Sequence, residues 1–230
     1  MTVLFIECLS ENYSKTLDLV KEKLLSPAFN DEDFKRIKKS NVEGLESMKK
    51  NSQYLAGTAI SNVLFGDTPF GRSMTEKSIK KIKVKDVKEF YNNYSPNISE
   101  LVAVGNISKD DFYKELDFLR KWKNKNISIP TNFEFPEDNT TQIYLLDKEG
   151  ASQSFILMGH KSNTYDTDGE YFKSQVMNKS LGGGASGRLF LNLREDKGFT
   201  YGAYSFFMAA EFKYDSLVEL NSSFVKPVFV

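Results

Sequence analysis

Arg194 and Tyr201 are the two residues whose types and spacing could do chemistry together. Arginine carries a permanent charge and five N–H donors, and the tyrosine hydroxyl adds one more donor. Six residues separate the two, and Gly198 lies between them, so a tight turn can bring both side chains to one face. Together they could anchor or polarise a carbonyl group. From the spacing alone, the preferred interpretation is a last-turn arginine favoured by the helix dipole and a strand tyrosine half in the core.

The segment 179–204 contains the elements that must position this pair. It opens with three consecutive glycines, 182–184, which permit backbone conformations that other residues avoid. Apolar residues at helical spacing follow and predict a short helix over 188–196, which Gly198 would end. The aromatic-rich stretch 199–207 then predicts a strand. The predicted order is loop, short helix, turn and strand.

Composition excludes several classes of protein. Hydrophobic residues make up 40% and charged residues 27% of the 230-residue chain, as in ordinary globular proteins. Lys and Arg total 31, and so do Asp and Glu, so no bulk charge attracts nucleic acid. No apolar run approaches the ~20 residues that span a bilayer. The first residues do not resemble a signal peptide, and the single cysteine, Cys8, does not assign a compartment: cytoplasm and bacterial cell envelope both stay open.

A run of lysines stands out against this balance. The default interpretation is a solvated helix face, since no stacking platform of aromatic residues accompanies the run. Its members are Lys77, Lys80, Lys81, Lys83, Lys85 and Lys88.

Hydrophobic periodicity predicts a mixture of helices and strands without a regular βαβ repeat, which favours α+β layers with helices on a mainly antiparallel sheet. The predicted helices are 10–25, 31–50, 54–64, 85–94, 108–122, 166–181 and 188–196. The predicted strands are 2–9, 101–104, 142–148, 152–161, 199–207 and 214–222. The polar stretch 123–139 contains Pro130 and Pro136, and it is the predicted linker between a block at 1–122 and a block at 140–230.

The segment 179–204 resembles the second domain of the M16 (insulinase, pitrilysin-like) metallopeptidases. The resemblance rests on the glycine run, on Arg-Leu-Phe at 188–190, on Leu-Arg-Glu at 193–195 and on Gly-Phe-Thr-Tyr at 198–201. Gly187 stands where the family has a serine. Further marks at 64–72, 94–108 and 150–160 extend the similarity over nearly the whole chain.

The resemblance implies two incomplete copies of the M16-type domain. Residues 1–122 would be the C-terminal part of a first domain, and 140–230 the N-terminal part of a second. Arg194 and Tyr201 match the pair with which the family holds the substrate backbone, and Gly183 and Gly184 would border the peptide. The implied partners are a peptide substrate and either a zinc-bearing M16 subunit or the missing parts of the same protein. The alternative is a non-proteolytic structural or peptide-binding paralogue.

Zinc binding in the family requires an inverted HxxEH motif, in which two histidines on one helix face reach the ion. This chain has one histidine, His160, so the motif is absent, and we expect no metal site or cofactor in this chain. His160 ends a predicted strand and more simply packs or hydrogen-bonds near an edge. The family's downstream glutamate would fall near Glu43 to Glu46, where Gly44 stands at the ligand position and a solvated helix face is the preferred interpretation.

A dinucleotide-binding loop is the remaining alternative for the glycines. Gly182, Gly184 and Gly187 spell GxGxxG, but the pattern follows a predicted helix where a strand is required. The sequence therefore does not favour nucleotide binding.

The first prediction is that this chain alone has no zinc-dependent peptidase activity, because the two-histidine motif is absent. Elemental analysis after metal-free purification, paired with cleavage of an unstructured peptide, measures it. Stoichiometric zinc together with chelator-sensitive cleavage would contradict the prediction.

Overall fold

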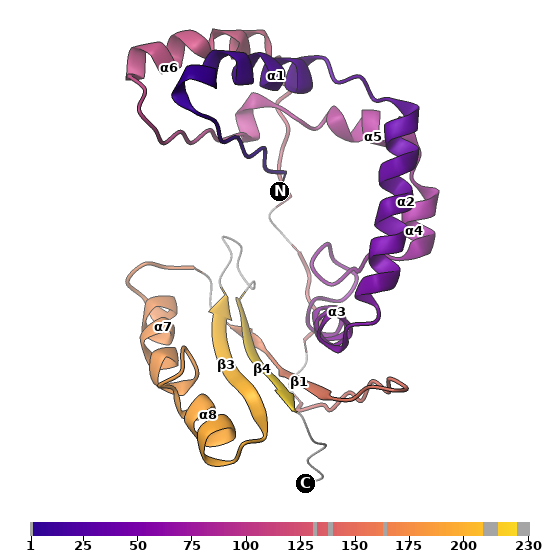
Figure 1. The fold of residues 1–230 in the computed structure, drawn as a ribbon, viewed down its shortest axis with the longest axis vertical. Helices are drawn as coiled ribbons and strands as arrows, with labels where there is room; N and C mark the ends of the chain where they lie inside the picture. Colours follow the sequence, from indigo (N-terminus) through magenta and orange to yellow (C-terminus); the bar gives the residue numbers. More distant parts are fainter. Residues whose placement is uncertain (1, 131–132, 138–139, 163–164, 209–215, 225–230) are drawn as a thin grey trace. The chain divides into compact units, whose positions relative to one another are not determined.

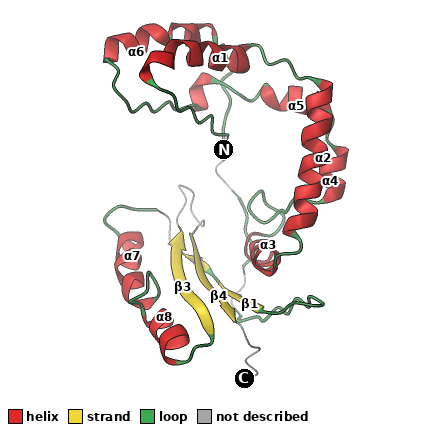
Figure 2. Cartoon of the chain, in the orientation of Figure 1, coloured by secondary structure: helices red, strands yellow, loops and turns green. Residues whose placement is uncertain are grey.

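A computed structural model describes residues 2–130, 133–137, 140–162, 165–208 and 216–224, and for Ser162 and 216–224 the backbone alone (Figure 1). Among the described residues, helices and loops fill the first part of the chain, and the strands all follow residue 153 (Figure 2). Contacts divide the chain into two compact units. The first unit is 1–41 with 77–130, and the second is 42–76 with 131–230.

The first unit is helical. Asn30 caps α2, because its Oδ1 accepts the N–H of Glu32 at 2.8 Å, and the Ser108 Oγ accepts the N–H of Asp111 at 3.1 Å at the start of α6. Leu17 and Ile79 are among its buried apolar residues. The elements are η1 (Ser10–Asn12), α1 (Tyr13–Leu25), the start of α2 (Asp31–Met48), α4 (Glu76–Lys81), α5 (Val84–Tyr91), η2 (Pro96–Ile98), α6 (Lys109–Glu115) and η3 (Asp117–Lys121).

The second unit is organised around β4 (Ser216–Phe224). β3 (Thr200–Met208) pairs antiparallel with one edge of β4, and β1 (Ser154–Met158) and β2 (Lys161–Ser162) pair antiparallel with the other. α7 (Glu170–Leu181) and α8 (Arg188–Phe190) pack against β3, and α3 (Ser52–Phe65) packs against β1 (Figure 1). Every pair of strands is antiparallel and helices cover the sheet, so the predicted α+β class is confirmed at this level.

Three predicted strands are wrong. Residues 2–9, 101–104 and 142–148 have no strand partner among the described residues. Their apolar side chains face solvent: Val104 is 97% exposed and Ile143 is 94% exposed. Strand propensity measures how well a residue fits a pleated surface, so an apolar run becomes a strand only where a neighbour supplies hydrogen bonds and burial.

Three predicted helices differ most from the observed elements. The helix predicted over 108–122 is divided into α6 and η3. The helix predicted from Asp166 begins at Glu170, because the Asp166 carboxylate accepts the N–H of Gly169 at 2.7 Å and holds a turn before it. The helix predicted over 188–196 starts as α8 and continues as the π-helical segment η4 (Leu191–Asp196).

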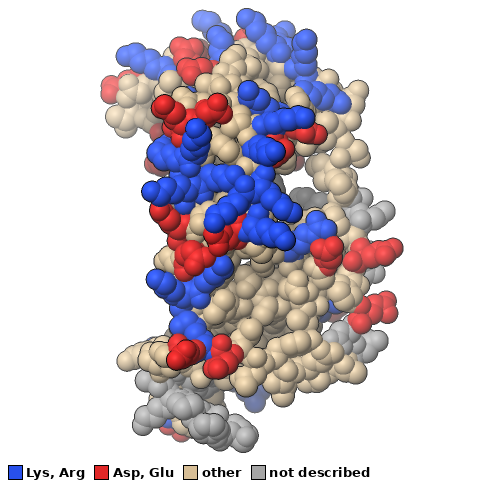
Figure 3. All heavy atoms as spheres, turned by 90° about the vertical axis from the view of Figure 1, so that its right-hand side faces the viewer, with Lys and Arg blue, Asp and Glu red and all other residues tan. Residues whose placement is uncertain are grey.

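The predicted exposure of the basic run is confirmed, but the run is divided between α4, Lys83 and α5 and does not form one helix face. All six lysines between 77 and 88 are exposed, and Figure 3 shows Lys and Arg side chains crowded on this side of the molecule. Among the described helices, none combines the length and the apolar composition that a bilayer crossing requires.

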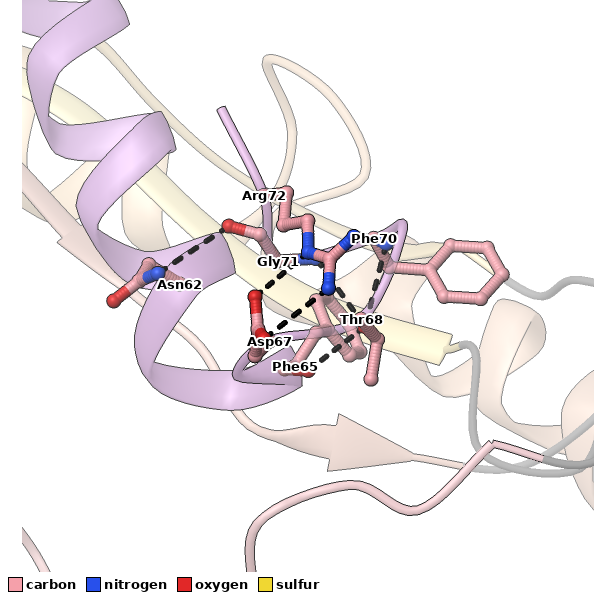
Figure 4. A network of polar contacts seen from close by, with 7 residues as sticks. All are labelled: Asn62, Phe65, Asp67, Thr68, Phe70, Gly71 and Arg72. Carbon is pink, nitrogen blue, oxygen red and sulfur yellow. Dashed lines mark hydrogen bonds and ion pairs between the residues drawn. The ribbon is translucent and has the colours of Figure 1, made fainter. Parts of the chain in front are cut away.

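A hydrogen-bonded turn closes α3 (Figure 4). Thr68 Oγ1 donates to the carbonyl of Phe65 at 2.8 Å and accepts the N–H of Phe70 at 3.3 Å. Arg72 binds the Asp67 carboxylate through Nε at 2.7 Å and through a terminal nitrogen at 3.1 Å. These hydrogen bonds, with the charge of the guanidinium, lower the pKa of Asp67.

The predicted linker is partly packed on this turn. The ring of Phe133 lies 5.3 Å from that of Phe70, and the ring of Phe135 lies 5.6 Å from that of Phe65. Contacts therefore place residues 42–76 in one unit with residues 131–230. The domain boundary predicted from the sequence lies instead at 123–139. That boundary stays a prediction about where the chain is most open to cleavage.

Limited proteolysis tests this boundary. We expect the first cut by a broad-specificity protease within 123–139 and outside the packed Phe133–Phe135 stretch, because the segment is polar and contains two prolines. Mass spectrometry of the early fragments locates the cut. Early cuts inside 1–122 with none in the window would show that the boundary is wrong.

Candidate functional site

The glycine loop, residues 182–187, joins α7 to α8 and is held from both sides. The carbonyl of Asn178, in the last turn of α7, accepts the N–H groups of Gly182 at 3.0 Å and Gly183 at 2.8 Å. From β3, the Ser205 N–H donates to the carbonyl of Gly182 at 3.0 Å. The loop backbone is therefore fixed to both a helix and a strand.

A buried polar pair holds α7 to β3. The Asn178 amide donates to the carbonyl of Ser205 at 2.8 Å, and the Ser205 hydroxyl donates to the Asn178 amide oxygen. Asn178 is 5% exposed and Ser205 is 0% exposed. Because buried polar groups are costly unless satisfied, these reciprocal bonds select one position of the helix on the strand. Sequence reasoning missed the pair because α7 turns polar residues, Gln175 and Asn178, toward β3. The apolar residues Phe172, Val176 and Met177 are exposed, so no apolar stripe marks the buried face of this helix.

Gly182 is the most tightly packed glycine of the loop. A Cβ there would lie 2.5 Å from the Ser205 Oγ and 2.6 Å from the Ser205 amide nitrogen, closer than such atoms approach. At Gly184 a Cβ would meet only the Lys179 Nζ, at 3.8 Å. The predicted site residues Gly183 and Gly184 are exposed and half-buried, respectively, so they remain accessible beside the fixed position 182.

Arg194 lies in η4 and stacks on an aromatic ring. Its guanidinium carbon is 4.7 Å from the centroid of the Phe190 ring, and its Nε is 3.5 Å from a carboxylate oxygen of Glu195. Phe190 is 5% exposed and lies 5.7 Å from the ring of Tyr204 on β3. The stack orients the arginine by a cation–π interaction, and 45% of its side chain stays exposed.

Tyr201 lies near the start of β3, inside the register irregularity between Thr200 and Ala203. It is 76% exposed, so it is not a core tyrosine. The predicted turn at Gly198 is present: Gly198 has φ of 61° and donates to the carbonyl of Arg194 at 3.0 Å. In the described chain no hydrogen bond or ring contact joins Arg194 to Tyr201, and their sharing one cavity stays a prediction.

The other candidate residues have ordinary surface roles. His160 is exposed, and its Nδ1 lies 2.6 Å from the carbonyl of Lys161. Glu46 forms an ion pair with Lys49 at 3.1 Å. Within the described ranges, no three His, Cys, Asp or Glu residues come together as a metal site would require.

Sequence comparison connects the chain to one family. Residues 81–224 match the family described as the peptidase M16 inactive domain. The non-peptidase homolog YmxG of Helicobacter pylori is 28% identical over 204 residues, covering 86% of this chain and 46% of that protein. The uncharacterized zinc protease YmxG of Bacillus subtilis is 26% identical, covering 91% of this chain and 51% of that protein. The chain spans about half the length of these curated relatives.

Solved structures show the same fold. A peptidase M16 inactive domain from Pseudomonas fluorescens superposes with a TM-score of 0.81 at 24% identity, over 94% of this chain and 52% of that one. A protease from Helicobacter pylori superposes with a TM-score of 0.82 at 18% identity, over 94% of this chain and 53% of that one.

Gly182→Ala tests the fixed loop. The added methyl group would clash with Ser205, and overpacking of this kind costs about 1–3 kcal/mol in the free energy of unfolding. Urea titration followed by circular dichroism measures the loss. Gly184→Ala is the matched control, since its Cβ has room, and an equal loss in both variants would contradict this account of the loop.

Proposed function

This chain belongs to the peptidase M16 inactive domain family, and from that premise we propose that it supplies the substrate-binding half of a peptide-cleaving clamshell. Arg194 and Tyr201 hold the backbone of the peptide, and Gly183 and Gly184 border it. The observation that carries the proposal is that both side chains reach solvent from a segment whose backbone is fixed.

The chemistry of the two side chains supports a binding role. The guanidinium presents planar N–H donors, and its stack on Phe190 limits its freedom before a ligand arrives. The exposed tyrosine hydroxyl adds a donor on the neighbouring strand. Arg194 and Tyr201 would donate hydrogen bonds to carbonyl oxygens of the peptide backbone. Because they would not contact the side chains of the substrate, they would bind peptides of any sequence.

Catalysis in this proposal belongs to another part of the assembly. The chain carries two incomplete M16-type domains, and a zinc-bearing M16 subunit or the remaining parts of a longer protein supply the metal. Zinc would provide a Lewis acid and an activated water there. This chain's own residues bind and orient the peptide.

A non-proteolytic role is the second candidate function. One relative is named a non-peptidase homolog, and a protein of Bacillus subtilis that is 20% identical is named a probable inactive metalloprotease. Such a paralogue would keep the peptide-binding surface and never meet a zinc-bearing partner. The coding sequence that surrounds this chain discriminates between the two: an HxxEH motif there favours the protease.

Arg194→Ala and Tyr201→Phe test the proposed pair. Removing one charge-assisted contact should cost on the order of 1.5–3 kcal/mol, roughly a tenfold to hundredfold fall in peptide turnover by the complete protein or the complex with its catalytic partner. Fluorogenic peptide cleavage measures it. Lys197→Ala, in the next turn, is the control.

The unfolding midpoint of each variant separates binding from folding. We expect Tyr201→Phe to unfold at the wild-type midpoint, since Tyr201 is 76% exposed. Arg194→Ala should lose only about 0.5–1 kcal/mol, the value of the cation–π contact with Phe190. Unchanged peptide turnover in both variants would contradict the proposal that Arg194 and Tyr201 bind the peptide backbone. Unchanged turnover in Tyr201→Phe alone would assign the binding to Arg194.

A further inference from the structure

The first unit contains a cavity of about 650 Å³ that is separate from the candidate peptide site. The C-terminal half of α1 forms one wall, Tyr91 at the end of α5 forms a second, and residues 121–125 form the third. Its volume lies within the range of cavities that hold small ligands.

Hydrogen bonds fix the walls of this cavity. The Tyr91 hydroxyl donates to the carbonyl of Leu24 in the last turn of α1, which ties α5 to α1. The N–H of Lys125 donates to the Ser95 Oγ at 2.9 Å, and Ser95 is fully buried. The cavity therefore exists before any ligand arrives, which lowers the entropic cost of binding.

Lysines dominate the charge of the cavity. Of the two carboxylates, Glu22 lies 3.4 Å from the Lys23 Nζ and is partly neutralised. The ammonium group of Lys125 is already held by the protein, because its Nζ donates to the carbonyl of Asn92 at 2.9 Å. The remaining lysines form no ion pair within the described residues and are free to bind an anion. These lysines are Lys21, Lys121 and Lys123, and the second carboxylate is Asp18.

Apolar side chains complete the site. Leu25, Tyr91 and Trp122 line the cavity and can receive an apolar or aromatic side chain. Free phosphate has no apolar group to place against this part of the wall. A peptide with acidic and apolar side chains matches both the lysines and the apolar wall.

We propose that this cavity binds a short acidic peptide segment that carries an apolar or aromatic side chain. The acidic groups meet Lys21, Lys121 and Lys123, and the apolar group lies against Trp122. The site is independent of Arg194 and Tyr201, so it survives if the proposed function fails.

Trp122 is the only tryptophan of the chain, so its fluorescence reports on this cavity alone. The intact chain is titrated with a blocked pentapeptide of four glutamates around a central phenylalanine. We expect a saturable change in emission that weakens as salt rises from 50 to 500 mM, because partly exposed charges are screened. The matching peptide with four lysines and inorganic phosphate serve as the other two titrants, and both should leave the emission unchanged.

The double variant Lys121→Gln, Lys123→Gln should weaken the glutamate peptide about threefold to tenfold, as expected for exposed charge pairs. Lys173→Gln on α7, where the lysine pairs with Glu170, is the matched control and should bind like the wild type. Equal affinity for the two peptides, a full response to phosphate, or no loss in the double variant overturns the proposal. If the double variant does not fold, the salt dependence and the two peptides in the wild type decide it.

Discussion

The reciprocal hydrogen bonds between Asn178 and Ser205 are the constraint on which the candidate peptide site depends. They are buried, and they fix α7 on β3 at the point where the glycine loop begins. Removing one partner would leave an unsatisfied buried amide or carbonyl, at a cost of about 1–3 kcal/mol. The same contact explains why position 182 has no room for a side chain, since the strand that carries Ser205 passes directly beside it.

A second contact, between Phe190 and Arg194, connects this packed region to the candidate site. Phe190 is buried, and its ring makes two contacts. One is with the ring of Tyr204 on β3, and the other is with the guanidinium of Arg194. The π-helical turn of η4 carries that arginine, and π-helical turns often occur at functional sites. Tyr201 lies at an irregularity of β3, where a strand can direct a side chain away from its usual face. The site thus combines a buried pair of hydrogen-bonded residues, Asn178 and Ser205, with the exposed hydrogen-bond donors of Arg194 and Tyr201.

The balanced total charge conceals an uneven distribution. The first unit carries nineteen Lys and Arg residues against fourteen Asp and Glu, whereas the second carries twelve against seventeen. The excess of lysine falls where the cavity beside Trp122 lies, and on the exposed face that Figure 3 shows. A zero net charge argues against general binding to polyanions, but it does not argue against a local site for an acidic group.

The sequence by itself determined most helices, the α+β class and the family, because apolar spacing, caps and glycine placement are local properties. Gly198, which ends the η4 segment with a positive φ, was predictable in this way. Only the tertiary structure decided which apolar runs became strands: 154–158 found a partner in β4, whereas 101–104 and 142–148 found none in the described chain. It likewise decided that Gly182 is the constrained glycine and that Asn178 and Ser205 meet. Those facts depend on residues 23 and 27 positions apart, and no local pattern records them.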